Sequence, residues 1–170
     1  MTTGSNPRPT DRAWIKALAE ASLAEGAWRL KDPDAVKRRA SDSLLSIVTD
    51  LFEMMADAAE VFNLHRSTIK PLRVLPWQPE GANAARGFIV FSGAVQLKLE
   101  QRADFYLEES VVAVRDYQRH PKKLHAFAPH IDNFGGLTWI MDKRLTMTPE
   151  LIIKQLLKDI CIAVVGAGRK

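Results

Sequence analysis

Residues 33–62 read PDAVKRRASDSLLSIVTDLFEMMADAAEVF. Apolar residues recur at alternating steps of three and four, and a second apolar row lies beside the first, as in a helix with a broad apolar face. The two rows are Leu44, Ile47, Leu51, Met54, Ala58 and Val61, and Val48, Phe52, Met55, Ala59 and Phe62. Asp32 and Pro33 suit the helix start, because a carboxylate caps free amides and proline loses no helical hydrogen bond in the first turn. The pattern predicts a long core-facing helix, with a break at Ser41–Ser43 left open.

Two further helices are predicted on either side. The first runs from about residue 10 to about residue 30, and its short link to the central helix favours an antiparallel pair. The last opens at Thr148-Pro149-Glu150, with a cap residue, a first-turn proline and an acid at the positive end. It is apolar almost all round, but it carries four polar or charged residues: Lys154, Gln155, Lys158 and Asp159. A membrane span needs about 20 nearly uncharged residues, so this helix is predicted to be buried in the core or in an interface.

The middle of the chain changes to a period of two, which is typical of half-buried strands. Ile89, Phe91, Val95, Leu97 and Leu99 share one parity, and the pattern fits either one strand bulged at Gly93 or two strands joined at Ser92-Gly93. Leu72–Leu75 is predicted as a strand at a sheet edge, and Leu137–Met141 with Arg144–Met147 as a last hairpin that turns at Asp142-Lys143. The segment 105–117 favours a strand because of its valines, but a helix stays open because Glu108, Glu109 and Arg115 would suit a helix face.

These elements together predict an α+β fold with an N-terminal helical pair, an antiparallel sheet and a C-terminal apolar helix. Residues 1–9 are expected to form a disordered tail, and residues 10–170 a single domain. The chain has one cysteine, Cys161, and its start does not resemble a signal peptide, so a cytoplasmic protein is expected.

The positive charge is unevenly distributed. Residues 1–64 carry eight Lys or Arg against ten Asp or Glu, whereas residues 65–148 carry twelve against eight. The formal net charge is +4, which permits a polyanionic partner without requiring one.

The segment 115–132 reads RDYQRHPKKLHAFAPHID and is predicted to be a basic loop, because Pro121 and Pro129 disfavour regular structure. Three interpretations are open. The first is a solvated loop with no ligand. The second is a nucleic-acid contact in which cations neutralise phosphates and aromatic rings stack on bases. The third is a catalytic or metal site formed by His120, His125, His130 and Asp132.

The functional prediction is a small binding protein that contacts nucleic acid through this loop. Its predicted binding residues are Arg115, Tyr117, Arg119, Lys122, Lys123 and His125, with Trp77 as a further stacking surface. The alternatives are a homodimer or an assembly protein acting through its apolar helices, and an enzyme using the histidine-rich loop. No catalytic residue, metal ligand or cofactor is predicted, since no common enzyme motif is present. No membrane association is predicted either, since the most apolar helix carries charged residues.

Overall fold

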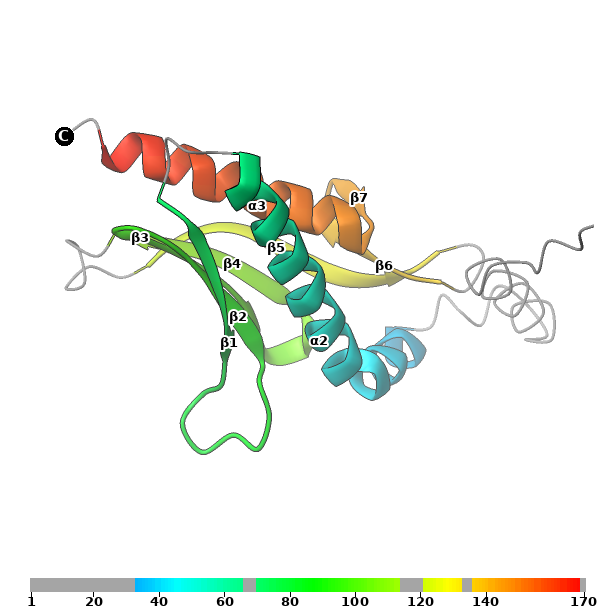
Figure 1. Cartoon of the computed structure of the whole chain (residues 1–170). Helices are drawn as coiled ribbons and strands as arrows, with labels where there is room; N and C mark the ends of the chain where they lie inside the picture. The colour runs from blue at the N-terminus through cyan, green and yellow to red at the C-terminus, as the bar shows by residue number, and fades with distance from the viewer. Residues whose placement is uncertain (1–32, 66–69, 114–120, 133–135, 169–170) are drawn as a thin grey trace, which may run out of the picture.

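The computed structural model describes residues 33–65, 70–113, 121–132 and 136–168. Within these ranges the chain forms one N-terminal helix, a seven-stranded sheet and a C-terminal helix (Figure 1). The helices are α2 (Pro33–His65), the 3-10 turn η2 (Ala103–Phe105) and α3 (Pro149–Ala167). The strands are β1 (Leu72–Trp77), β2 (Gly87–Ser92), β3 (Val95–Gln101), β4 (Leu107–Ala113), β5 (Lys122–Ile131), β6 (Leu137–Met141) and β7 (Leu145–Met147).

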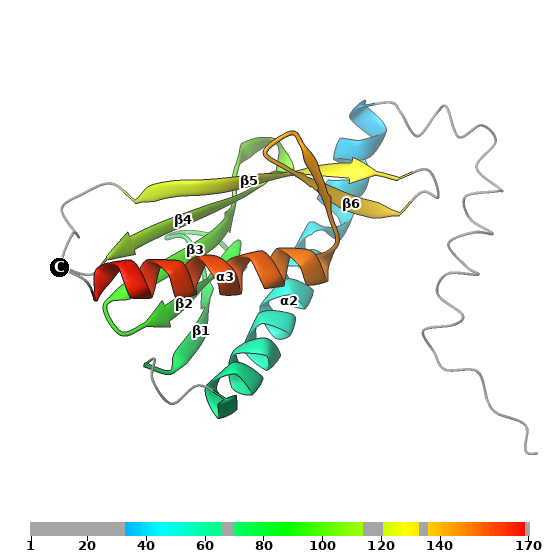
Figure 2. The ribbon, with the colours of Figure 1, turned by 90° about the horizontal axis from the view of Figure 1, so that it is seen from above.

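The sheet is an antiparallel meander in which every strand pairs with the next one in sequence. Both helices lie against one face of the twisted sheet (Figures 1 and 2). We call this the helix-covered face and the other the outer face. Alternation along the strands divides residues between the two faces, and this division determines which polar groups meet.

The core lies between the helix-covered face and the two helices. The central helix contributes Val48, Leu51, Met55 and Ala59, all buried, and the edge of Phe52 packs against Phe88 of β2. The C-terminal helix contributes Ile152, Ile153, Leu156 and Ile160. Near the end of the central helix the prediction was wrong for Val61, which is 57% exposed, whereas Ala58 and Phe62 pack against the core.

Several predictions from the sequence are confirmed. The period-two region forms two strands joined at a turn in which Gly93 has a φ of 57°, so the single bulged strand is excluded. The last hairpin turns at Asp142 and Lys143, and Thr148 caps α3 by accepting a hydrogen bond from the Leu151 amide. The central helix continues through Ser41–Ser43 without a break.

Two features of the predicted fold need correction. The first helix of the expected pair lies outside the described residues, so the N-terminal part of the described structure is one helix and not a pair.

No described helix has both the length and the apolar character needed to cross a membrane.

The second correction concerns the predicted basic loop, because residues 122–131 form strand β5. The pairing of β4 with β5 ends at Leu107 and Phe127, so Pro129 lies where β5 pairs with β6 alone. A proline is tolerated there because its missing N–H can face the unpaired side of the strand. Residues 114–120 lie outside the described residues.

Candidate metal centre

Glu109 is a carboxylic acid in the interior of the protein. On β4 it shares the helix-covered face with Leu107 and Val111, and it pairs across the sheet with Leu99 on one side and His125 on the other. Its side chain is completely buried, and neither carboxyl oxygen accepts a hydrogen bond from a donor among the described residues; a hydrogen bond to Asp159 forms when Glu109 itself is protonated. Leaving such a group unsatisfied costs about 1–3 kcal/mol, more when it is charged, so this position calls for an explanation.

His125 and Asp159 lie next to this carboxyl. His125 comes from β5, opposite Glu109, and Asp159 comes from the face of α3 that packs on the sheet, one residue before the buried Ile160. One ligand atom from each of the three residues can be chosen so that all lie within 4.8 Å of one another. The His125 Nε2 atom is 3.4 Å from Oδ2 of Asp159.

Asp142 holds the other side of the His125 ring. His125 Nδ1 donates to Oδ2 of Asp142 over 2.6 Å, while Oδ1 of Asp142 accepts from the Ala126 amide over 3.0 Å. The Asp142 amide in turn donates to the Ala126 carbonyl over 2.8 Å. Asp142 has a φ of 50°, in the left-handed region that aspartate tolerates better than most residues. With Nδ1–H given to Asp142, Nε2 is the nitrogen left for the interior.

Gln155 supports the site from the preceding turn of α3. Its Nε2 donates to Oδ2 of Asp159 over 2.7 Å and lies 3.4 Å from Nε2 of His125. Gln155 and Asp159 are four residues apart, so they lie on one side of the helix. The amide orients the carboxylate toward His125.

The pKa values of the Glu109 and Asp142 carboxyl groups shift in opposite directions. Burial, then the charge of Asp159 and a hydrogen bond to it, and then the charge of Asp142 raise the pKa of Glu109 to about 9. Partial burial acts to raise the pKa of Asp142, but the hydrogen bonds from the Ala126 amide and His125 outweigh it and lower that pKa. In the absence of a cation, Glu109 therefore carries a proton at neutral pH while Asp142 is ionised.

The arrangement fits a divalent cation. Two carboxylates and one imidazole nitrogen suit borderline ions such as Zn²⁺, Mn²⁺ and Fe²⁺, and the two negative charges of the ionised ligands would balance the ion. A histidine ligand that gives its second N–H to a carboxylate is the usual outer-shell arrangement of protein metal sites, and the contact of His125 with Asp142 has this form.

The predicted nucleic-acid residues are only partly described. Arg115, Tyr117 and Arg119 lie outside the described residues, Lys122 is exposed, and Lys123 binds Glu108 on the outer face over 2.8 Å. His125 faces the carboxylates of the interior. Because the pairing of β4 with β5 shifts register between Glu109 and Ser110, Lys123 and His125 lie on opposite faces of the sheet although they are only two residues apart.

The predicted histidine-loop site is also divided. His125 lies on the helix-covered face, and His130 has the opposite parity on the same strand. Asp132 accepts a hydrogen bond from the Gly136 amide over 2.7 Å, and His120 lies outside the described residues. Only His125 of that set belongs to the cluster described here.

Sequence reasoning missed Glu109, Asp142 and Asp159 as possible partners of His125. One signal was present: if 107–113 is a strand, Glu109 alternates with Leu107 and Val111 and lies on their face. An acid in such a position is unusual enough to suggest a partner or an ion.

Comparisons with other proteins add no identification. The chain matches no protein-family model, and neither the curated proteins nor the solved structures yield a match.

Proposed function

We propose that this chain is a metal-binding protein whose centre is formed by Glu109, His125 and Asp159. One observation carries the proposal: a completely buried carboxyl accepts no hydrogen bond from a donor among the described residues and lies beside an imidazole nitrogen and a second carboxylate. A divalent transition-metal ion would satisfy all three groups at once.

The site would leave coordination positions open. Three protein ligands are fewer than the four to six that these ions take, and the His125 side chain is 25% exposed, so the cluster is not sealed from solvent. An ion held there can bind water and act as a Lewis acid. Metal-assisted hydrolysis or hydration is the reaction class that this chemistry favours.

The test is direct binding of Zn²⁺ and Mn²⁺ to protein stripped with a chelator, measured by isothermal titration calorimetry. We expect one ion per chain and a loss of affinity of roughly 100-fold in Glu109→Gln, in which the charged ligand becomes neutral. Glu108→Gln is the matched control, because it changes the adjacent residue on the outer face. Binding that is absent, or equal in Glu109→Gln and the control, would show that Glu109 is a protonated structural residue instead.

Two predictions from the sequence stay untested. Half of the predicted nucleic-acid residues, Arg115, Tyr117 and Arg119, lie outside the described ranges. Association through the apolar helices is compatible with exposed residues such as Leu64 on α2 and Ile162 on α3, but these do not indicate a particular partner.

A further inference from the structure

A pocket of about 510 Å³ lies between the loop end of the β1–β2 hairpin and the residues at and after the end of β3. Its walls include Trp77, Arg86, Glu100, Arg102 and Phe105. Pockets that bind small molecules typically have volumes of about 300–1,000 Å³, with apolar walls and a few convergent polar groups. The volume of this pocket falls in that range, and four of its eight lining residues are polar: Arg86, Glu100, Gln101 and Arg102.

Strand register places two wall residues in one row. Trp77 pairs with Gly87, and Gly87 pairs with Glu100, and the central residue of this row approaches the β3 backbone closely. A Cβ at position 87 would lie 2.0 Å from the Leu99 carbonyl oxygen, and only glycine fits. Two backbone hydrogen bonds fix the neighbouring residue: the Arg86 amide donates to the Trp77 carbonyl, and the Gln101 amide donates to the Arg86 carbonyl. These hydrogen bonds fix the backbone of Arg86 between Trp77 and Gln101.

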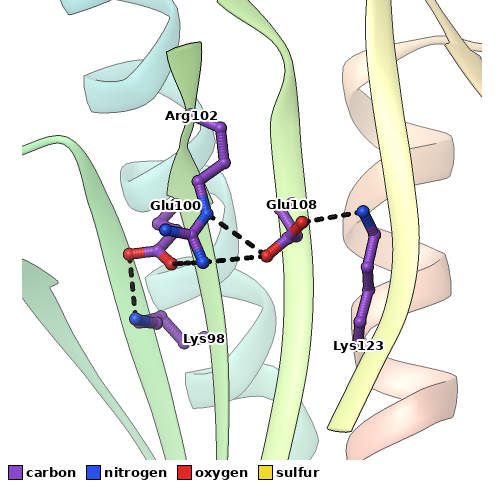
Figure 3. A network of polar contacts seen from close by, with 5 residues as sticks. All are labelled: Lys98, Glu100, Arg102, Glu108 and Lys123. Carbon is purple, nitrogen blue, oxygen red and sulfur yellow. Dashed lines mark hydrogen bonds and ion pairs between the residues drawn. The ribbon is translucent and has the colours of Figure 1, made fainter. Parts of the chain in front are cut away.

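Arg102 is positioned by two carboxylates (Figure 3). Its Nη2 atom lies 2.9 Å from Glu100 and 3.0 Å from Glu108, and its Nε atom donates to Glu108 over 3.2 Å. Lys98 and Lys123 complete the chain of contacts at its two ends. Nη1 of Arg102 has no hydrogen-bond partner among the described residues, so one edge of an oriented guanidinium remains available.

The charge of this region favours an anion. The network contains three cations, Lys98, Arg102 and Lys123, against two carboxylates. Arg86 adds a fourth cation at the pocket wall; it is exposed, and its guanidinium has no ion-pair partner among the described residues. Planar guanidinium groups bind carboxylate and phosphate through paired hydrogen bonds, which suits an anion between Arg86 and Arg102.

The aromatic walls favour a planar body. Trp77 presents its ring to the site, with the ammonium nitrogen of Lys98 4.7 Å from the ring centroid. Its indole nitrogen is buried without a hydrogen-bond partner among the described residues. Phe105 has a φ of 62°, which is rare for a bulky residue and is often found where backbone strain supports a binding site.

We propose that this pocket binds a small planar organic anion, with its carboxylate or phosphate at Arg86 and Arg102 and its ring against Trp77 and Phe105. The site is independent of the metal centre, because Glu100 and Glu108 lie on the outer face and Glu109 lies on the helix-covered face. The loss of one site leaves the other intact.

The test is calorimetric titration of the full chain with 2-naphthoate, 2-naphthyl phosphate and the uncharged 2-naphthamide. We expect saturable binding of at least one anion, weaker binding of the amide, and a loss of roughly tenfold in Arg86→Gln, the equivalent of about 1.4 kcal/mol. Arg73→Gln is the control, since Arg73 is an exposed arginine of β1 that lies outside this pocket.

Three results would overturn the proposal: no saturable binding of either anion at millimolar concentration, equal binding of the amide, or equal losses in Arg86→Gln and Arg73→Gln. Repeating the titration with chelator present separates this site from the metal centre. Anion binding that is unchanged by the chelator supports an independent pocket, and binding that disappears with the metal contradicts it.

Discussion

Glu108 and Glu109 are neighbours on β4, and their carboxyl groups lie on opposite faces of the sheet in opposite electrostatic environments. Partial burial acts to raise the pKa of Glu108, but hydrogen bonds from Lys123 and Arg102 outweigh it and lower that pKa. Burial and nearby carboxylates raise the pKa of Glu109 to about 9. Alternation along one strand thus makes one glutamate a surface ion pair and the other a buried acid.

The stability of the metal-free protein should depend on pH through Glu109. Its pKa is about 9 in the folded state and near 4.5 when unfolded, so the stability that its proton contributes is fully present below pH 4.5, falls as pH rises above 4.5, and is lost as pH passes 9. The free energy of unfolding should therefore fall between pH 5.5 and 8 relative to Glu109→Gln, by up to about 1.4 kcal/mol per pH unit. Urea unfolding with chelator present measures this.

Glu108→Gln is the control for that measurement. The pKa of Glu108 is lowered, so the contribution of Glu108 to stability is present above pH 4.5 and lost only at lower pH. The pH dependence of Glu108→Gln between pH 5.5 and 8 should match that of the unsubstituted protein. If Glu109→Gln shows that same dependence, Glu109 does not carry the proton.

Metal binding should release the proton of Glu109, because a carboxyl ligand must be ionised. At pH 7 we expect about one proton per ion, seen as a binding heat that changes with the ionisation enthalpy of the buffer. Glu108→Gln should release the same number of protons. Binding without proton release would exclude Glu109 as a ligand.

Asp142 should act as a positioning residue for His125. Asp142→Gly keeps the positive φ of the turn and removes the acceptor for Nδ1, so Zn²⁺ affinity should fall by about 10–100-fold, as for other outer-shell partners. Lys143→Gly is the matched control, since Lys143 has a φ of 63° in the same turn. Calorimetry should show a lower affinity in the first variant alone; equal affinities would leave Asp142 with a structural role in the turn.

Alanine substitutions of Gly87 and Gly166 should change the stability of the protein in opposite directions. Gly87→Ala places a methyl group 2.0 Å from the Leu99 carbonyl oxygen and should destabilise the protein by several kcal/mol, with loss of the β2–β3 register. Gly166→Ala, where a Cβ meets nothing within 4 Å on α3, should stabilise it by up to about 1 kcal/mol. Thermal unfolding compares the two. Similar midpoints would contradict the β2–β3 geometry described above.

The sequence by itself determined the local elements. Periodicity located the central helix and the strands β2 and β3, because one buried face imposes a period of 3.6 or of 2. Turn and cap chemistry located Asp142-Lys143 and Thr148, because left-handed φ values and free helix amides select a few residue types. The strand β5 was missed because Pro129 disfavours a strand wherever both edges are paired, and the sequence does not show which edges are paired.

Only the tertiary structure decided which of these elements meet. His125 contacts Asp142, 17 residues away, and Gln155, 30 residues away, and it faces Glu109 through the pairing of β4 with β5. These partners come from a strand, a turn and a helix, and no spacing in the chain relates them. Strand register brings Glu109 opposite His125, and the packing of α3 on the same face supplies Asp159, so the candidate metal centre is a consequence of long-range packing.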